Sequence, residues 1–194
     1  MSAHNIICLE AEWLYNDNRY KFDLKSEPLL QCLKEFHKIE LIHRHILDRN
    51  GLVHYMKYLA PSKKRMEKFD IVYFACHGRS HAISLEGEDG LIDLKALADL
   101  ALPNNFFENR IVHFGSCKTL ANPAAAEEFK KNTKARLVCG YTTSVDAMKC
   151  AIVDMALFNH LININNVGTI LNEQRSKFWK SYRSILDELG FVAY

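Results

Sequence analysis

Short apolar runs alternate with stretches of helical periodicity along most of this chain. The clearest runs are residues 5–9, 70–76, 110–116 and 135–143, and each has the length of a strand buried on both faces. This alternation indicates an α/β fold with a mainly parallel sheet. Because the 194 residues contain no internal repeat and no linker, we predict one domain spanning residues 1–194, built as a three-layer α/β/α sandwich.

The stretches between these runs predict the remaining elements. A helix is expected from Ser26, a possible N-cap, with Pro28 in its first turn, and another from Asn122 as N-cap and Pro123. The sequence EGEDG lies between two short alternating runs and predicts a hairpin, with Glu86, Glu88 and Asp89 at a solvated tip. The other expected elements are a strand within residues 38–47 and helices at 50–59, 94–102, 146–162 and 167–190. In the last helix, basic residues alternate with aromatic ones, which is typical of an amphipathic helix packed on a core.

Charge and hydropathy exclude several classes of function. Lys and Arg number 25 against 23 for Asp and Glu, so the formal net charge is only +2 and favours neither a nucleic-acid nor a membrane partner. No stretch approaches the roughly 18 unbroken apolar residues of a membrane helix. The first residues lack the basic and apolar regions of a signal peptide. We therefore expect a cytoplasmic protein.

The six cysteines are expected to be thiols. Cys8, Cys76, Cys139 and Cys150 lie in apolar stretches, where cysteine behaves as a small hydrophobic residue. A reducing cytoplasm would keep them unpaired. Because the sequence contains no CxxC pair, we predict no structural zinc site, and we expect neither a metal nor a cofactor.

Two of the predicted buried strands are followed by residues that can take part in catalysis. Residues 70–76 are followed by His77 and Gly78, and residues 110–116 lead into Cys117. Carboxyl ends of parallel strands gather functional groups at one edge of a sheet, so we expect His77 and Cys117 to lie close together. A nearby imidazole can deprotonate a cysteine thiol, and the N–H groups of Gly78 and Cys117 can bind a developing oxyanion.

Each of these residues also has a structural interpretation. A single cysteine or histidine at a strand end more often has a structural role, and it is the order of the two motifs that favours catalysis. We assign structural or solvated roles to the other strand histidines, His43, His45 and His113.

The two motifs and the segments around them resemble a known group of enzymes. ACHG, SLEGEDGLIDLKALADL and IVHFGSCKT follow one another in the order found in the caspase-like cysteine peptidase clan, and within that clan the sequence is similar to bacterial CHAT domains. The resemblance covers roughly residues 68–162. It implies a caspase-hemoglobinase-like fold, with His77 as general base, Cys117 as nucleophile, and the N–H groups of Gly78 and Cys117 as oxyanion hole.

The resemblance further implies a cysteine endopeptidase that cleaves a partner protein under the control of a regulatory protein. Bacterial defence or programmed cell death is the implied setting. The loop TTSVDAM occupies the place where this clan builds its specificity pocket, so Ser144 and Asp146 are candidate substrate-binding residues, with Asp146 pairing with Lys or Arg. Asp146 is also well placed to cap the following helix, which is the favoured interpretation, and both roles can hold together.

Two other functions stay open. The chain can be a catalytically inactive caspase-like module for protein–protein interaction, although the intact His77 and Cys117 argue against this. It can also be a doubly wound α/β domain that binds a small molecule at the same strand ends. The sequence lacks the common glycine-rich phosphate-binding patterns, which disfavours the second alternative.

Overall fold

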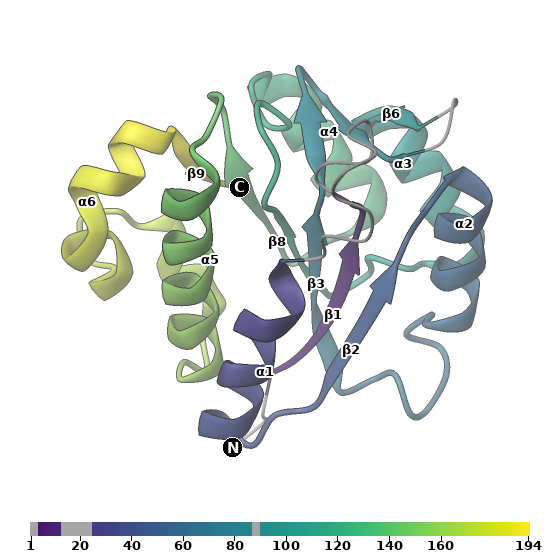
Figure 1. Ribbon diagram of the computed structural model, residues 1–194, viewed down its shortest axis with the longest axis horizontal. Helices are drawn as coiled ribbons and strands as arrows, with labels where there is room; N and C mark the ends of the chain where they lie inside the picture. Colours follow the sequence, from purple (N-terminus) through teal and green to yellow (C-terminus); the bar gives the residue numbers. More distant parts are fainter. Residues whose placement is uncertain (1–3, 13–24, 87–89) are drawn as a thin grey trace.

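The computed structural model describes residues 4–12, 25–86 and 90–194. Its centre is a six-stranded sheet with the order β2-β1-β3-β7-β8-β9 (Figure 1). The first five strands in this order are parallel, and β9 is antiparallel to β8. The mainly parallel sheet is therefore confirmed. Its strands are β1 Asn5–Glu10, β2 Leu41–His45, β3 Phe69–Ala75, β7 Ile111–Phe114, β8 Leu137–Tyr141 and β9 Phe191–Ala193.

Helices cover both faces of this sheet (Figure 1). Successive residues of β1 point to opposite sides, so that Ile6 and Cys8 join one core while Ile7 and Leu9 join the other. Apolar runs without alternation arise because both faces are buried, and the predicted three-layer sandwich is confirmed. One layer is α1 Ser26–His37, α5 Ala147–Ile162 and α6 Lys177–Leu189, and the other is α2 Arg49–Tyr58, α3 Leu94–Ala101 and α4 Pro123–Thr133.

Of the two N-cap residues predicted from the sequence, one is confirmed and the other is wrong. Asn122 caps α4, and its side chain accepts a hydrogen bond from the N–H of Ala125 at 3.3 Å. Ser26 is not an N-cap, because α1 begins at Ser26 and its N-cap residue, Lys25, offers no side-chain bond. A carboxylate from the sheet takes that place, since Glu10 Oε1 accepts from the N–H groups of Lys25 and Ser26.

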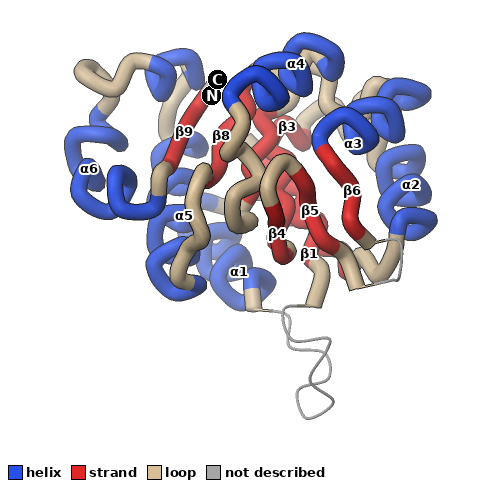
Figure 2. Tube along the Cα trace, turned by 90° about the horizontal axis from the view of Figure 1, so that it is seen from above, coloured by secondary structure: helices blue, strands red, loops and turns tan. Residues whose placement is uncertain are grey.

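A small antiparallel sheet follows the carboxyl end of β3. Its strands are β4 His77–Arg79, β5 Ala82–Ser84 and β6 Leu91–Asp93, and Figure 2 shows them from above. The predicted hairpin is β5 and β6, whereas β4 was not expected. Residues 87–89 of its tip, with Glu88 and Asp89, lie outside the described residues. Glu86 is not a solvated tip residue, because its carboxylate accepts from the N–H of Glu12 and contacts the ring of His45.

The predicted single helix over residues 167–190 is wrong. A 3₁₀ helix covers Val167–Leu171, α6 starts only at Lys177, and β9 follows it. Between the two helices the side chain of Asn172 accepts from the N–H of Arg175, which is a local bond that competes with a continuous helix. Gly190 ends α6 with a φ of 61°, in the left-handed region. The amphipathic character of α6 is confirmed, since its Phe178 and Trp179 are buried.

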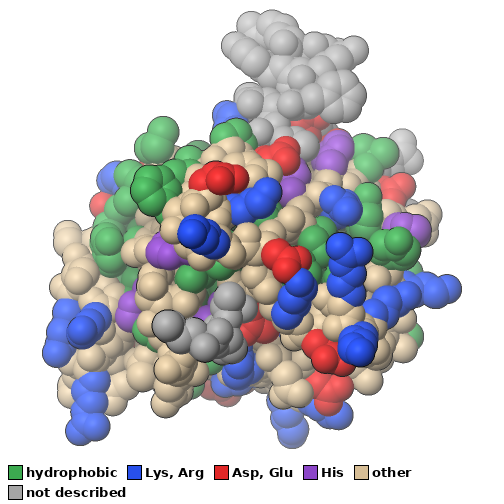
Figure 3. All heavy atoms as spheres, turned by 90° about the horizontal axis from the view of Figure 1, so that it is seen from below, with side chains coloured by type: hydrophobic (Ala, Val, Ile, Leu, Met, Phe, Trp, Pro, Cys, Tyr) green, Lys and Arg blue, Asp and Glu red, His purple; other side chains and the backbone are tan. Residues whose placement is uncertain are grey.

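Two surface properties bear on possible partners. Within the described ranges, no helix combines the length and apolar character needed to cross a membrane. Seen from below, basic and acidic side chains lie interspersed on the surface, as the near balance of charge in the sequence leads one to expect (Figure 3).

Candidate catalytic site

Neighbouring parallel strands bring His77 and Cys117 to the same edge of the large sheet. β3 and β7 pair directly, with Phe74 opposite Phe114 in the register. His77 is the first residue of β4 and stands two positions after the end of β3, while Cys117 stands three positions after the end of β7. The juxtaposition of these two strand ends therefore follows from the sheet topology.

Gly78 is in close contact with the loop that carries Cys117. A Cβ atom on Gly78 would lie 2.4 Å from the carbonyl oxygen of Cys117, 2.6 Å from Thr119 Oγ1 and 2.8 Å from the Cβ of Ser116. No side chain fits in that space, because real Cβ atoms do not approach other atoms so closely. The glycine after His77 is thus explained by the packing of its backbone on the cysteine loop.

Hydrogen bonds fix the cysteine loop on both sides. Thr119 Oγ1 donates to the carbonyl of Ala82 in β5 at 3.2 Å, and it lies 2.7 Å from Ser116 Oγ. On the other side the N–H of Lys118 donates to the carbonyl of Thr143 at 2.9 Å. Lys118 has a φ of 57°, a left-handed conformation that is uncommon for a residue with a side chain. The residue directly after Cys117 therefore stores backbone strain.

The sulfur of Cys117 is partly accessible and receives a hydrogen bond. The N–H of Val145 donates to Cys117 Sγ at 3.4 Å. This bond holds the sulfur beside the loop that precedes α5. His77 is exposed, so both side chains can be reached from solvent. Among the described residues no acceptor is bonded to the N–H of Cys117, which leaves that group available to an oxyanion.

The predicted substrate-binding residues flank the donor to the sulfur. Ser144 and Asp146 are the exposed neighbours of Val145. Asp146 caps α5, because its Oδ1 accepts from the N–H of Lys149 at 2.9 Å. Its second interpretation, as the base of a specificity pocket, stays a prediction.

Sequence reasoning missed a buried polar cluster beneath the cysteine loop. The carboxylate of Asp154 in α5 accepts from Tyr73 Oη at 2.7 Å and Tyr141 Oη at 2.6 Å, and it lies 2.6 Å from His113 Nε2. Burial alone would lower the pKa of His113, but the charge of Asp154 outweighs it and raises that pKa to about 10. His113 and Asp154 therefore form a buried ion pair. The sequence did contain a signal for this cluster. Asp154 is an acidic residue in a largely apolar helix, and the strands beneath that helix carry a histidine and two tyrosines.

Comparison with solved structures shows a similar fold in two other proteins, one of them a cysteine protease. A secreted C11 cysteine protease from Bacteroides thetaiotaomicron, solved with an irreversible peptide inhibitor, matches with a TM-score of 0.55 at 12% identity. The complex of the pro- and mature domains of RgpB from Porphyromonas gingivalis matches with a TM-score of 0.52 at 8% identity. The matches cover 93% and 96% of this chain but only 59% and 44% of those chains.

These likenesses establish a caspase-like α/β fold and, at such low identity, the fold alone. No curated protein matches the chain. A family model, described as a family of unknown function, does match, and it covers residues 3–194. Because that match spans nearly the whole sequence, the chain belongs to the DUF6642 family.

Proposed function

We propose that this protein is a cysteine endopeptidase in which His77 is the general base and Cys117 the nucleophile. The observation that carries the proposal is the contact of Gly78 with the Cys117 carbonyl, because it holds the backbone beside His77 against the nucleophile loop. By analogy of fold, the likeness to a solved cysteine protease supports a catalytic cysteine and histidine at these strand ends.

The chemistry follows from the proposed roles. His77 accepts the proton of the Cys117 thiol, and the thiolate attacks the carbonyl carbon of a peptide bond. The oxyanion that forms is stabilised by the N–H groups of Gly78 and Cys117. His77 then returns the proton to the leaving amine, which gives a thioester. Water deprotonated by His77 hydrolyses the thioester and frees the thiol.

The finer parts of the proposal rest on resemblance. The order of the motifs favours a CHAT-like peptidase whose substrate is a protein and whose activity is set by a regulatory protein, in bacterial defence or programmed cell death. The position of Ser144 and Asp146 beside Val145 supports substrate binding by this loop, since Val145 contacts the sulfur directly.

Covalent labelling with a peptidyl acyloxymethyl ketone tests the proposal. We expect one adduct per chain in the intact mass, mapped to Cys117 after digestion. Cys117→Ala should abolish the adduct, and His77→Ala should slow its formation. Cys32→Ser is the matched control, because Cys32 is the other accessible cysteine and should contribute nothing. A folded protein that stays unlabelled, or that is labelled at Cys32, would indicate the inactive interaction module instead.

A further inference from the structure

A second cluster of reactive side chains lies at the carboxyl ends of β1 and β2. The parallel register places Cys8 opposite His43, and Glu10 follows Cys8 on the same face of β1. One potential ligand atom of each residue lies within 4.8 Å of the other two. The cluster thus presents a thiol sulfur, a carboxylate oxygen and an imidazole nitrogen to one point.

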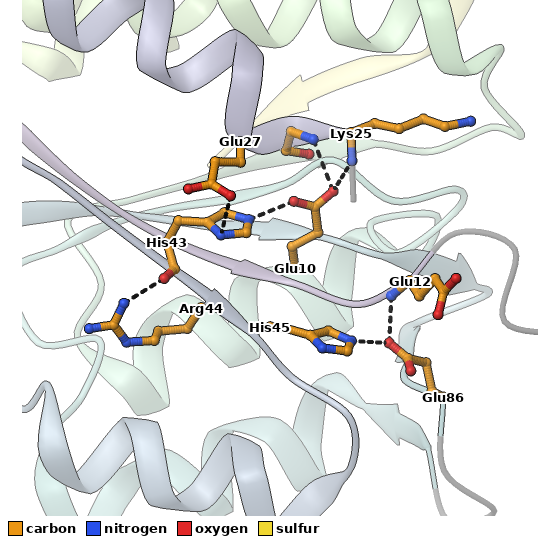
Figure 4. Close-up of polar contacts among 9 residues, drawn as sticks. Glu10, Glu12, Lys25, Glu27, His43, Arg44, His45 and Glu86 are labelled. Carbon is orange, nitrogen blue, oxygen red and sulfur yellow. Dashed lines mark hydrogen bonds and ion pairs between the residues drawn. The ribbon is translucent and has the colours of Figure 1, made fainter. Parts of the chain in front are cut away.

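The carboxylate of Glu10 is fully buried and held in a fixed orientation (Figure 4). Its Oε1 accepts from the N–H groups of Lys25 at 2.8 Å and Ser26 at 2.9 Å, at the start of α1. Its Oε2 faces His43 Nε2 at 2.7 Å. Backbone N–H groups at the start of α1 therefore bind one oxygen, and the other oxygen faces the histidine.

The imidazole of His43 lies between two carboxylates (Figure 4). Its Nε2 faces Glu10, and its Nδ1 lies 3.6 Å from Glu27 Oε2. Histidines that bind metals almost always pair their second nitrogen with a carboxylate or a carbonyl, which fixes the tautomer and the ring orientation. Glu27 lies on that side of the ring as an ion-pair partner, at a distance longer than a hydrogen bond.

We propose that Cys8, Glu10 and His43 form a binding site for a divalent zinc ion. Sulfur, imidazole and carboxylate donors together suit zinc, which takes three protein ligands and leaves a fourth position for water. On binding, the Cys8 thiol releases its proton to solvent. The thiolate and the Glu10 carboxylate then balance the two charges of the metal, so that the buried site carries no net charge. His43 binds through its neutral Nε2.

The zinc ion would replace the direct contact between Glu10 and His43. Ligand atoms around tetrahedral zinc lie about 3.3 Å apart, so the two groups need to separate by roughly half an ångström. The competing interpretation is a purely structural pair, in which Glu10 and His43 only tie the start of α1 to the sheet. Metal binding distinguishes the two, because a structural pair has no affinity for zinc. The inference does not depend on the peptidase proposal.

Cobalt substitution provides a direct test, since a cobalt–thiolate bond gives a charge-transfer absorption band. The starting protein is the full-length chain carrying Cys117→Ala and Cys32→Ser, which removes the two accessible thiols and leaves the buried ones. We expect the band at one cobalt per chain, and its displacement by zinc. At a hundredfold excess over Kd, zinc should raise the melting temperature by about 5–10 °C.

Variants identify the ligands. Cys8→Ser and His43→Gln should each abolish the band while the circular dichroism spectrum shows a folded chain. Cys139→Ser is the matched control, because Cys139 is also buried and lies 3.4 Å from a histidine nitrogen, that of His113. It should leave the band intact. A folded starting protein without the band, or a band that survives Cys8→Ser, overturns the proposal. Should Cys8→Ser fail to fold, His43→Gln decides alone.

Discussion

The backbone of Gly78 lies against the carbonyl of Cys117 so closely that a Cβ atom between them would be 2.4 Å from that oxygen. This contact joins the small sheet, which carries His77, to the loop that carries the cysteine. Its first consequence is a strict requirement for glycine at position 78.

Gly78→Ala should therefore disable the site. The added methyl group forces the cysteine loop away from β4, at a cost of about 1–3 kcal/mol in the free energy of unfolding. We expect labelling of Cys117 to slow by about tenfold or more, measured by mass spectrometry against time. Gly51→Ala is the control, because its nearest contact is an ordinary 3.4 Å in α2 and alanine favours the helix. If Gly78→Ala labels at the rate of the unaltered protein, the contact does not position the cysteine.

Cys117 should alkylate faster than Cys32, although Cys32 is the more exposed of the two. The expected cause is the donor from Val145 together with His77 as base. Iodoacetamide labelling under native conditions, followed by peptide mapping, gives the ratio of the two rates. His77→Ala should bring that ratio down toward one without lowering the melting temperature. Equal rates in the unaltered protein would show that the thiol is not activated.

Asp146→Asn separates the two interpretations of Asp146. Asparagine caps helices about as well as aspartate, so the melting temperature should change little. If the carboxylate also binds a basic side chain, cleavage after Lys or Arg should fall by about tenfold or more, because a charge-assisted hydrogen bond is lost. The measurement is kcat/KM on matched peptides with Arg or Leu before the cleaved bond. Unchanged cleavage after Arg leaves Asp146 as a cap only.

The buried pair of His113 and Asp154 predicts how stability depends on pH. The pKa of His113 rises from 6.5 to about 10 on folding, so its stabilisation is complete below pH 6.5 and is lost as the pH rises toward 10. In this window the free energy of unfolding should fall by about 1.4 kcal/mol per pH unit for that one proton. Urea unfolding between about pH 6.5 and about pH 8.5, below the main thiol titrations, measures the slope.

His113→Gln should remove that part of the slope, and Asp154→Asn should do the same if the first variant is too unstable to study. His4 needs its own control, because its hydrogen bond to Asp70 also raises its pKa. His4→Gln removes that second contribution and should leave the slope due to His113. A slope that disappears in His4→Gln but persists in His113→Gln would contradict the assignment.

The layers of the fold could be predicted from the sequence, because strands that are buried on both faces consist of unbroken apolar runs. β1, β3, β7 and β8 are all of this kind. β9 was missed because three residues carry no periodicity, and its pairing with β8 joins segments about fifty residues apart in the chain. The continuous helical pattern before it gave no sign that Asn172 would interrupt the helix.

The side-chain clusters likewise include some that local sequence predicts and some that it does not. That His77 and Cys117 follow neighbouring strand ends was predictable, because each follows its own strand and parallel topology alone brings strand ends together. The cluster of Cys8, Glu10 and His43 depends instead on the register between β1 and β2, which no local pattern specifies. Asp154 is a similar case, since its partners come from two different strands and meet only once α5 is packed on the sheet.

β4 begins after a single residue, Cys76, beyond the end of β3, so the chain passes from one sheet to the other almost without a connecting loop. The proposed base, His77, and the proposed nucleophile, Cys117, consequently belong to two separately hydrogen-bonded units that contact each other. Opening of that contact would part them while the six-stranded sheet stays intact. The reactivity of Cys117 is therefore expected to depend on the docking of the small sheet, and a ligand that stabilises or loosens this hairpin would raise or lower that reactivity without contacting His77 or Cys117.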